Sequence, residues 1–140
     1  MTAATLIGYG LEPVATFHID GDHFVMTITD ADKAAVCCGL YAFLVGDQIV
    51  RFGSSKASLR KRLRSWERDV SVSLKGGVSS TPHTEAAQWR DLMRPGVVGT
   101  VFTRAGTTIT TPAGTFNSYM AEESYLIGHH LPIMNRSKHR

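Results

Sequence analysis

The chain has 140 residues, a hydrophobic fraction of 43% and a formal net charge of +3. This length and composition are typical of one globular domain, so a second independent core is not expected. The sequence has no apolar run of about 18 residues that would span a bilayer, and residues 1–10 lack the basic start of a secretory signal. We therefore expect a single-domain protein of the cytoplasm, spanning residues 1–140, with no membrane partner.

The first strong pattern along the chain predicts a hairpin near the N-terminus. Apolar and polar residues alternate over residues 15–19 and 24–28, around the turn Asp20-Gly21-Asp22. We interpret residues 1–35 as an N-terminal addition to the core.

The two cysteines, Cys37 and Cys38, are adjacent in a stretch that reads as strand, where successive side chains point to opposite faces. Free thiols are therefore expected. Two cysteines without a CxxC spacing also argue against structural zinc.

The core elements follow along the chain. Two strands are predicted over residues 39–45 and 48–53, and a helix begins after Ser58. That helix carries an apolar stripe at helical spacing, formed by Leu59, Leu63, Trp66 and Val70. The remaining predictions are an inserted segment over residues 70–95 with a mobile loop and a short helix, a strand over 97–103, a loop or irregular hairpin over 106–116, and a last helix over 118–131. The predicted fold class is α+β, with a small antiparallel three-stranded core sheet flanked by helices and an extra N-terminal hairpin.

Positive charge is concentrated between residues 51 and 68. This block contains one acidic residue, Glu67, and seven basic residues, which are Arg51, Lys56, Arg60, Lys61, Arg62, Arg64 and Arg68. It is typical of a phosphate-facing surface. A solvated helix face without a ligand explains the block equally well.

Two charged residues border apolar helix faces. Arg62 lies close to the stripe of the first helix, and Glu123 falls within the apolar face of the last helix, whereas Glu122 points outward. A carboxylate on a buried face is costly unless a cation, hydrogen bonds or a metal compensate it. Glu123 is therefore either a metal ligand or the partner of an arginine.

Several ordered blocks resemble GIY-YIG nuclease domains. The opening blocks are Gly39-Leu40-Tyr41, Val50-Arg51-Phe52-Gly53 and Leu59-Arg60-Lys61-Arg62-Leu63, and the closing ones are Glu123-Ser124-Tyr125-Leu126-Ile127, Pro132 and Asn135. The resemblance covers residues 38–135. It suggests a free-standing member of the restriction or mobile-element type with DNA as its partner. Double-strand cleavage by a one-site enzyme would require a homodimer or sequential nicking.

The resemblance implies roles for individual residues. Tyr41 would take a proton from an attacking water, and Arg62 would clamp the scissile phosphate. Glu123 would hold one Mg²⁺ or Mn²⁺. Gly39, Gly53 and Asn135 would support the fold, and the DNA-binding residues would be Arg51, Lys56, Arg60, Lys61 and Arg64.

The chain departs from the family pattern in its second block. Arg51 stands where the family has tyrosine, and Trp66 stands where members often carry Tyr or His. General acid-base groups contribute about 10²- to 10⁴-fold, so two competing hypotheses follow: a divalent-metal-dependent DNA endonuclease, or a catalytically weakened nucleic-acid-binding protein. The residues also allow a reading without function, in which Tyr41 is a strand aromatic, Asn135 a turn residue, and Arg62 and Glu123 an inert ion pair.

Overall fold

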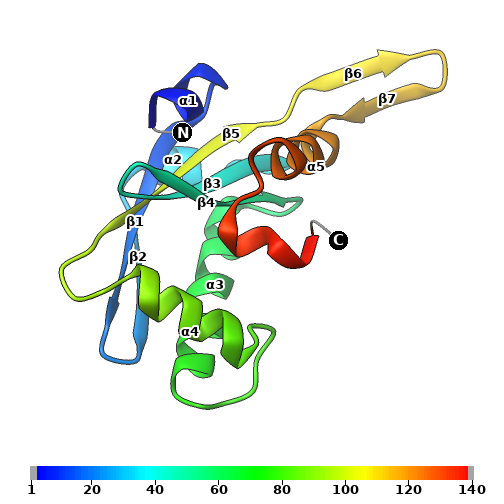
Figure 1. Ribbon diagram of the computed structural model, residues 1–140. Coiled ribbons are helices and arrows are strands. Elements are labelled where there is room, and N and C mark those ends of the chain that lie inside the picture. The colour runs from blue at the N-terminus through cyan, green and yellow to red at the C-terminus, as the bar shows by residue number, and fades with distance from the viewer. Residues whose placement is uncertain (1–2, 139–140) are drawn as a thin grey trace.

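The computed structural model describes residues 3–138, with side chains as far as residue 135. Its centre is an antiparallel five-stranded sheet in the order β2-β1-β5-β3-β4 (Figure 1). The strands are β1 (Glu12–Asp20), β2 (His23–Ile28), β3 (Gly39–Val45), β4 (Gln48–Ser55) and β5 (Gly99–Ala105). The α+β class is confirmed, and the three-stranded core sheet is corrected to five strands.

The two extra strands are the N-terminal hairpin. β1 pairs with β5 over residues 12–17, so the hairpin continues the core sheet. Phe17 and Phe24 are fully buried. A Cβ at Gly99 would lie 2.2 Å from Phe17 Cζ, so the ring of the hairpin occupies the space above the neighbouring strand. The hairpin is therefore part of the hydrophobic core.

Helices cover both faces of the sheet. They are α1 (Ala3–Gly8), α2 (Ala31–Ala34), α3 (Leu59–Leu74), α4 (His83–Leu92) and α5 (Tyr119–His130), followed by the 3-10 helix η1 (Ile133–Lys138). α3 and α4 pack on one face and α1 and α5 on the other, and each face has its own cluster of buried apolar side chains. In the described part of the chain, no helix has the length and apolar character needed to cross a membrane.

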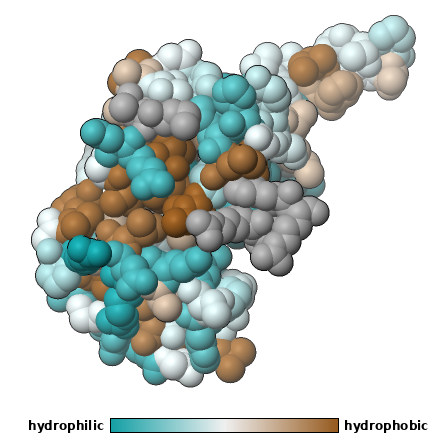
Figure 2. Space-filling view, in the orientation of Figure 1, coloured by the Kyte–Doolittle hydropathy of each residue, from teal (hydrophilic) through white to brown (hydrophobic). Residues whose placement is uncertain are grey.

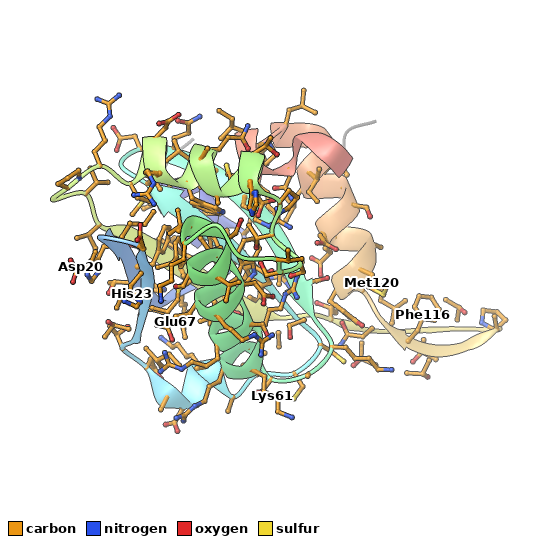
Figure 3. The ribbon with its side chains drawn as sticks, turned by 90° about the horizontal axis from the view of Figure 1, so that it is seen from below. Asp20, His23, Lys61, Glu67, Phe116 and Met120 are labelled. Carbon is orange, nitrogen blue, oxygen red and sulfur yellow. The ribbon has the colours of Figure 1, made fainter. Side chains whose placement is uncertain are left out.

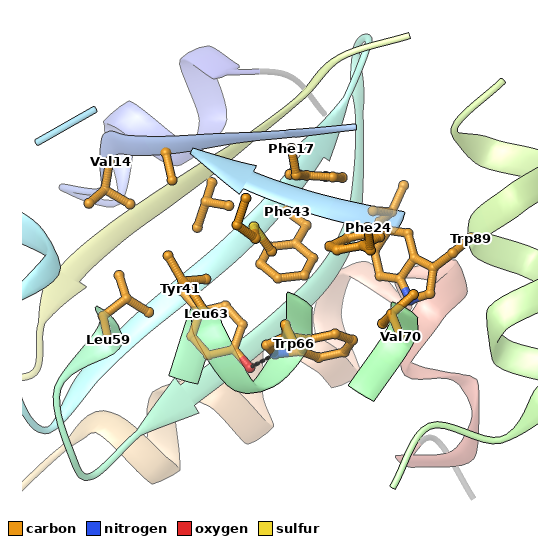
Figure 4. Close-up of a cluster of buried hydrophobic side chains, with 14 of the residues drawn as sticks. Val14, Phe17, Phe24, Tyr41, Phe43, Leu59, Leu63, Trp66, Val70 and Trp89 are labelled. Carbon is orange, nitrogen blue, oxygen red and sulfur yellow. Dashed lines mark hydrogen bonds between the residues drawn. The ribbon is translucent and has the colours of Figure 1, made fainter. Parts of the chain in front are cut away.

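α3 begins where its sequence predicts. Ser58 caps the helix by accepting a hydrogen bond from the backbone N–H of Lys61 at 3.3 Å. The whole predicted stripe, Leu59, Leu63, Trp66 and Val70, is buried against the sheet (Figure 4). The opposite side of α3 therefore faces solvent with most of its basic residues.

The predicted strand at Cys37 and Cys38 is wrong. Both residues precede β3 in a bend, and Cys38 has a positive φ of 51°, which turns the chain before Gly39. Both cysteines are free thiols, as expected.

The predicted irregular hairpin is a regular one. β6 (Thr108–Thr111) and β7 (Gly114–Asn117) form a separate two-stranded sheet. Figure 1 shows it extending from the body of the molecule between β5 and α5. We call residues 107–117 the arm.

Candidate active site

Tyr41 lies in β3, the interior strand next to the edge strand β4, with its side chain fully buried on the α3 side of the sheet. Its neighbour in β4 is Gly53, where a Cβ would lie only 2.2 Å from Tyr41 Cζ. The ring therefore fits only because residue 53 is glycine. At Gly39, which opens β3, a Cβ would lie 2.9 Å from Val36 Cγ1 and 3.1 Å from the Arg104 carbonyl oxygen.

The hydroxyl of Tyr41 accepts two hydrogen bonds. Trp66 Nε1 donates one at 2.9 Å (Figure 4), and Arg62 Nε donates the other at 3.2 Å. A neutral phenol has two acceptor lone pairs, so both are occupied. Sequence reasoning missed the Trp66 contact, because helical spacing indicates only that this side chain is buried and not where its N–H points.

Arg62 reaches from the solvent-exposed side of α3 to this buried hydroxyl. The pKa of Arg62 is raised above its ordinary value by Tyr41 first, and also by Glu123 and Asp69, while desolvation acts in the opposite direction. Within the described residues, neither terminal nitrogen of Arg62 has a hydrogen-bond partner. The guanidinium is thus held at Nε and can offer its outer edge to an anion.

Arg51 lies beside Arg62 on the same indole. Its Cζ is 4.6 Å from the centroid of the Trp66 ring, and that of Arg62 is 5.8 Å away. Arg51 Nη1 also donates to the Met134 carbonyl at 2.8 Å. A cavity of 220 Å³ opens beside the two guanidiniums, and its lining is Arg51, Arg62, Ser65, Trp66, Asp69, Ser80, Thr81 and Glu85.

Glu123 belongs to α5, which packs on the other face of the sheet from α3, and its side chain is partly buried beside β4. Ser54 Oγ donates to Glu123 Oε1 at 2.9 Å, a contact that the sequence did not indicate. The ion pairs of the described residues do not include one between Arg62 and Glu123, although the two interact electrostatically. Three segments distant in sequence therefore bring Tyr41, Arg62 and Glu123 to the edge strand β4.

Glu122 does not point freely outward as expected. It forms an ion pair with Arg104 at 2.7 Å and accepts a hydrogen bond from Ser118 Oγ at 2.7 Å. These contacts hold the pKa of Glu122 below its ordinary value, the Arg104 hydrogen bond being the main cause. The helix face is also less apolar than predicted, since Met120 and Leu131 are 62% and 60% exposed.

Asn135 is fully buried against the free edge of β4. Its Oδ1 accepts from the backbone N–H of Phe52 at 2.8 Å, and its Nδ2 donates to the Phe52 carbonyl at 3.0 Å. The side-chain amide thus takes the place of a neighbouring strand. This contact fastens the C-terminal segment beside the site.

We expect Asn135→Ala to lower the free energy of unfolding by about 2–4 kcal/mol, because the buried N–H and C=O of Phe52 would both lose their partner. Urea unfolding measures the change. Gln48→Ala, at an exposed position of the same strand, is the control and should change stability little. A loss below 1 kcal/mol for Asn135→Ala would mean that water replaces the amide at the strand edge.

The predicted DNA-binding residues differ in how many hydrogen bonds and ion pairs they already form within the protein. Lys56, Arg60 and Lys61 are exposed around the start of α3 (Figure 3 labels Lys61). Arg64 Nη1 instead donates to the Met26 carbonyl at 3.1 Å and to Glu67 at 3.2 Å. The exposed basic surface is therefore strongest at the N-terminal end of α3.

The site residues that the structure describes offer one carboxylate ligand to a magnesium-type ion and do not form a complete set of ligands around it. The described residues contain no group of three or more His, Cys, Asp or Glu that could enclose a metal. Mg²⁺ does not need such a cage, because it commonly keeps several waters and takes one or two carboxylates together with substrate phosphates. Glu123, oriented by Ser54, offers one such carboxylate.

Two solved structures share this fold. A mutant of EndoII from bacteriophage T4 is 16% identical, with a TM-score of 0.65, over 94% of this chain and 96% of that chain. The restriction endonuclease HPY188I in complex with product DNA is 17% identical, with a TM-score of 0.55, over 91% of this chain and 79% of that chain. No protein-family profile and no curated sequence matches the chain. The likeness therefore establishes the fold.

Proposed function

We propose that this protein is a GIY-YIG-type endonuclease that hydrolyses DNA phosphodiester bonds with the help of Mg²⁺ or Mn²⁺. The observation that carries the proposal is the meeting of Tyr41, Arg62 and Glu123 at the edge strand β4. Support also comes from the two fold neighbours, one of them a restriction endonuclease with product DNA.

In this proposal Arg62 binds the scissile phosphate. Its Nε is oriented by Tyr41, and its terminal nitrogens can form paired hydrogen bonds with phosphate oxygens. Arg51 supplies a second guanidinium against the same indole, that of Trp66. The tyrosine position of the second motif thus contributes positive charge here in place of a phenol.

Tyr41 is the proposed proton acceptor, and its environment sets a condition on that role. Both lone pairs of its oxygen are occupied while Arg62 stays on the hydroxyl. Loss of the phenol proton to solvent would leave a third electron pair on the oxygen, and this pair could take a proton from an attacking water while Arg62 and Trp66 keep their hydrogen bonds.

Glu123 is the proposed protein ligand of the metal, with Ser54 holding the carboxylate in place. When bound, a divalent cation would stabilise the negative charge that develops on the leaving oxygen. The chain's own contribution is one fixed carboxylate beside the phosphate that Arg62 holds.

The test is incubation of the purified protein with supercoiled plasmid and Mg²⁺ or Mn²⁺. We expect nicked or linear DNA above the background of a Glu123→Gln variant. Retarded but intact plasmid would instead favour the second candidate, a binding protein that has lost catalysis through Arg51 and Trp66. Parallel incubation with RNA tests whether the nuclease acts on DNA alone.

We expect the exposed residues at the start of α3 to carry much of the electrostatic attraction to DNA. Arg60→Ala and Lys61→Ala should each reduce the slope of log K against log salt by about 0.9, the value for one lost phosphate contact on duplex DNA. Titrations at several salt concentrations measure the slope. Arg94→Ala, which removes an exposed charge beyond α4, is the control. Equal slopes for all four proteins would place the DNA away from α3.

A further inference from the structure

The arm, residues 107–117, extends from the body as a free β-ribbon. All its residues from Thr107 to Phe116 except Thr111 are exposed, and among the elements that the structure describes none packs extensively on β6 or β7 apart from these two strands themselves. Figure 2 shows it as a mostly pale projection with an apolar patch, without the deep teal of charged residues. A ribbon without a core of its own is only marginally stable in water, so an exposed one is expected to meet a partner.

The root of the arm is held firmly to the site. Thr107 and Ser118 exchange two hydrogen bonds, from Thr107 N–H to Ser118 Oγ at 2.9 Å and from Ser118 N–H to the Thr107 carbonyl at 2.8 Å. Ser118 Oγ in turn donates to Glu122, the neighbour of Glu123 in α5. At Gly106 a Cβ would lie 2.0 Å from Asn117 Oδ1, which fixes the entry of the chain. The direction of the arm is therefore set relative to the proposed metal ligand.

The composition of the arm is unusual for a phosphate-binding segment. Residues 105–121 contain no Asp, Glu, Lys, Arg or His, whereas residues 107–117 contain five threonines. An uncharged segment can add little to the salt-dependent attraction to DNA. It can still contact base edges, because threonine hydroxyls donate or accept hydrogen bonds, and the side chains of Thr, Ala and Phe contact thymine methyl groups.

The shape of the arm fits a DNA groove. A two-stranded ribbon enters the major groove, which is about 12 Å wide and 8.5 Å deep, and four residues of strand extend about 13 Å. The register places Thr110 opposite Thr115 on one face, with their hydroxyls 3.2 Å apart, and Ile109 opposite Phe116 on the other. In Figure 3 the arm leaves the molecule to one side of α3, beyond Met120, and in Figure 1 it extends on the α5 side of the sheet, away from α3 and α4. The arm thus starts next to α5, which carries Glu123, and a duplex bound at the edge strand β4 could extend from the basic start of α3 to the arm.

We propose that the arm is a base-reading element that enters the major groove of the DNA next to the cleavage site. This inference rests on the proposed function, since it takes the DNA at the edge strand β4, between the basic start of α3 and α5. Affinity then comes from the basic start of α3 and sequence preference from the hydroxyl face of the arm.

The test is a selection of bound duplexes from a random DNA library, without divalent metal so that the DNA stays intact. We expect the protein to enrich a base preference, and the double variant Thr110→Val, Thr115→Val to weaken the discrimination by about tenfold at the positions concerned, as for a lost base contact. The slope of affinity against salt should stay unchanged. Thr84→Val, at an exposed position of α4, is the control.

Three results would overturn the inference. The native protein could enrich no base preference, or the double variant could keep the native preference. Comparison of the native protein and the variant by sedimentation could also show that the arm joins two copies of the chain. The plasmid assay separates this outcome from failure of the proposed function. A protein that selects a sequence but does not cut leaves the arm inference standing and removes the nuclease. A protein that cuts DNA without any sequence preference leaves the nuclease standing and removes the arm inference.

Discussion

Glu123→Gln is expected to abolish DNA cleavage while the fold and the affinity for DNA are retained. Glutamine keeps the shape of the side chain and its hydrogen bond from Ser54, and it removes only the anionic charge that a divalent cation requires. The measurement is the cleavage rate and the melting temperature of the same variant, each with and without Mg²⁺. The variant should also lose any stabilisation that Mg²⁺ gives the native protein.

The neighbouring acid provides a matched control. Glu122→Gln removes the charge from a side chain that pairs with Arg104, so we expect it to cost about 1 kcal/mol of stability and to leave cleavage largely intact. The two variants differ by one position on α5 and should therefore show opposite patterns. Full cleavage by a stable Glu123→Gln protein would remove Glu123 from the reaction, and with it the main support for a nuclease.

Local patterns in the sequence were reliable where a structure depends on residues close in the chain. The stripe from Leu59 to Val70 predicted the buried face of α3, because each of its members is set by helical spacing alone. The hairpin strands were likewise found from alternation. Their pairing with β5 was not, since Phe17 covers Gly99 only after residues more than 80 positions apart come together.

The candidate site could be predicted only in part for the same reason. Glycine at position 53 and arginine at position 62 are visible as motif residues, but the burial of Tyr41 beneath Arg62 depends on how α3 crosses the sheet. The partners Ser54 and Trp66 have ordinary residue types at ordinary positions. Their roles arise from side-chain directions, which the spacing of residues along a helix or strand does not determine.

Tyr41→Phe is expected to reduce the rate of cleavage by about 10²- to 10⁴-fold, the range for loss of a general base. The ring would still fill the space above Gly53, so the core should keep its packing. Trp66 Nε1 would lose its acceptor, and an unpaired buried donor costs about 1–3 kcal/mol. Single-turnover rates at saturating DNA, measured well below the melting temperature, separate the effect on chemistry from the effect on stability.

Trp66→Phe is the control because it breaks the same hydrogen bond from the other side. Both variants lose the contact between Trp66 Nε1 and Tyr41 Oη, but only Tyr41→Phe loses the hydroxyl that we assign to proton transfer. We therefore expect Trp66→Phe to be destabilised by a similar amount and to cut within about tenfold of the native rate, since Arg62 still orients the phenol. Equal losses of rate in the two variants would show that the hydroxyl serves only to hold Arg62 and Trp66 in place. The proton acceptor would then have to be sought among the groups that line the neighbouring cavity, where burial raises the pKa of Glu85.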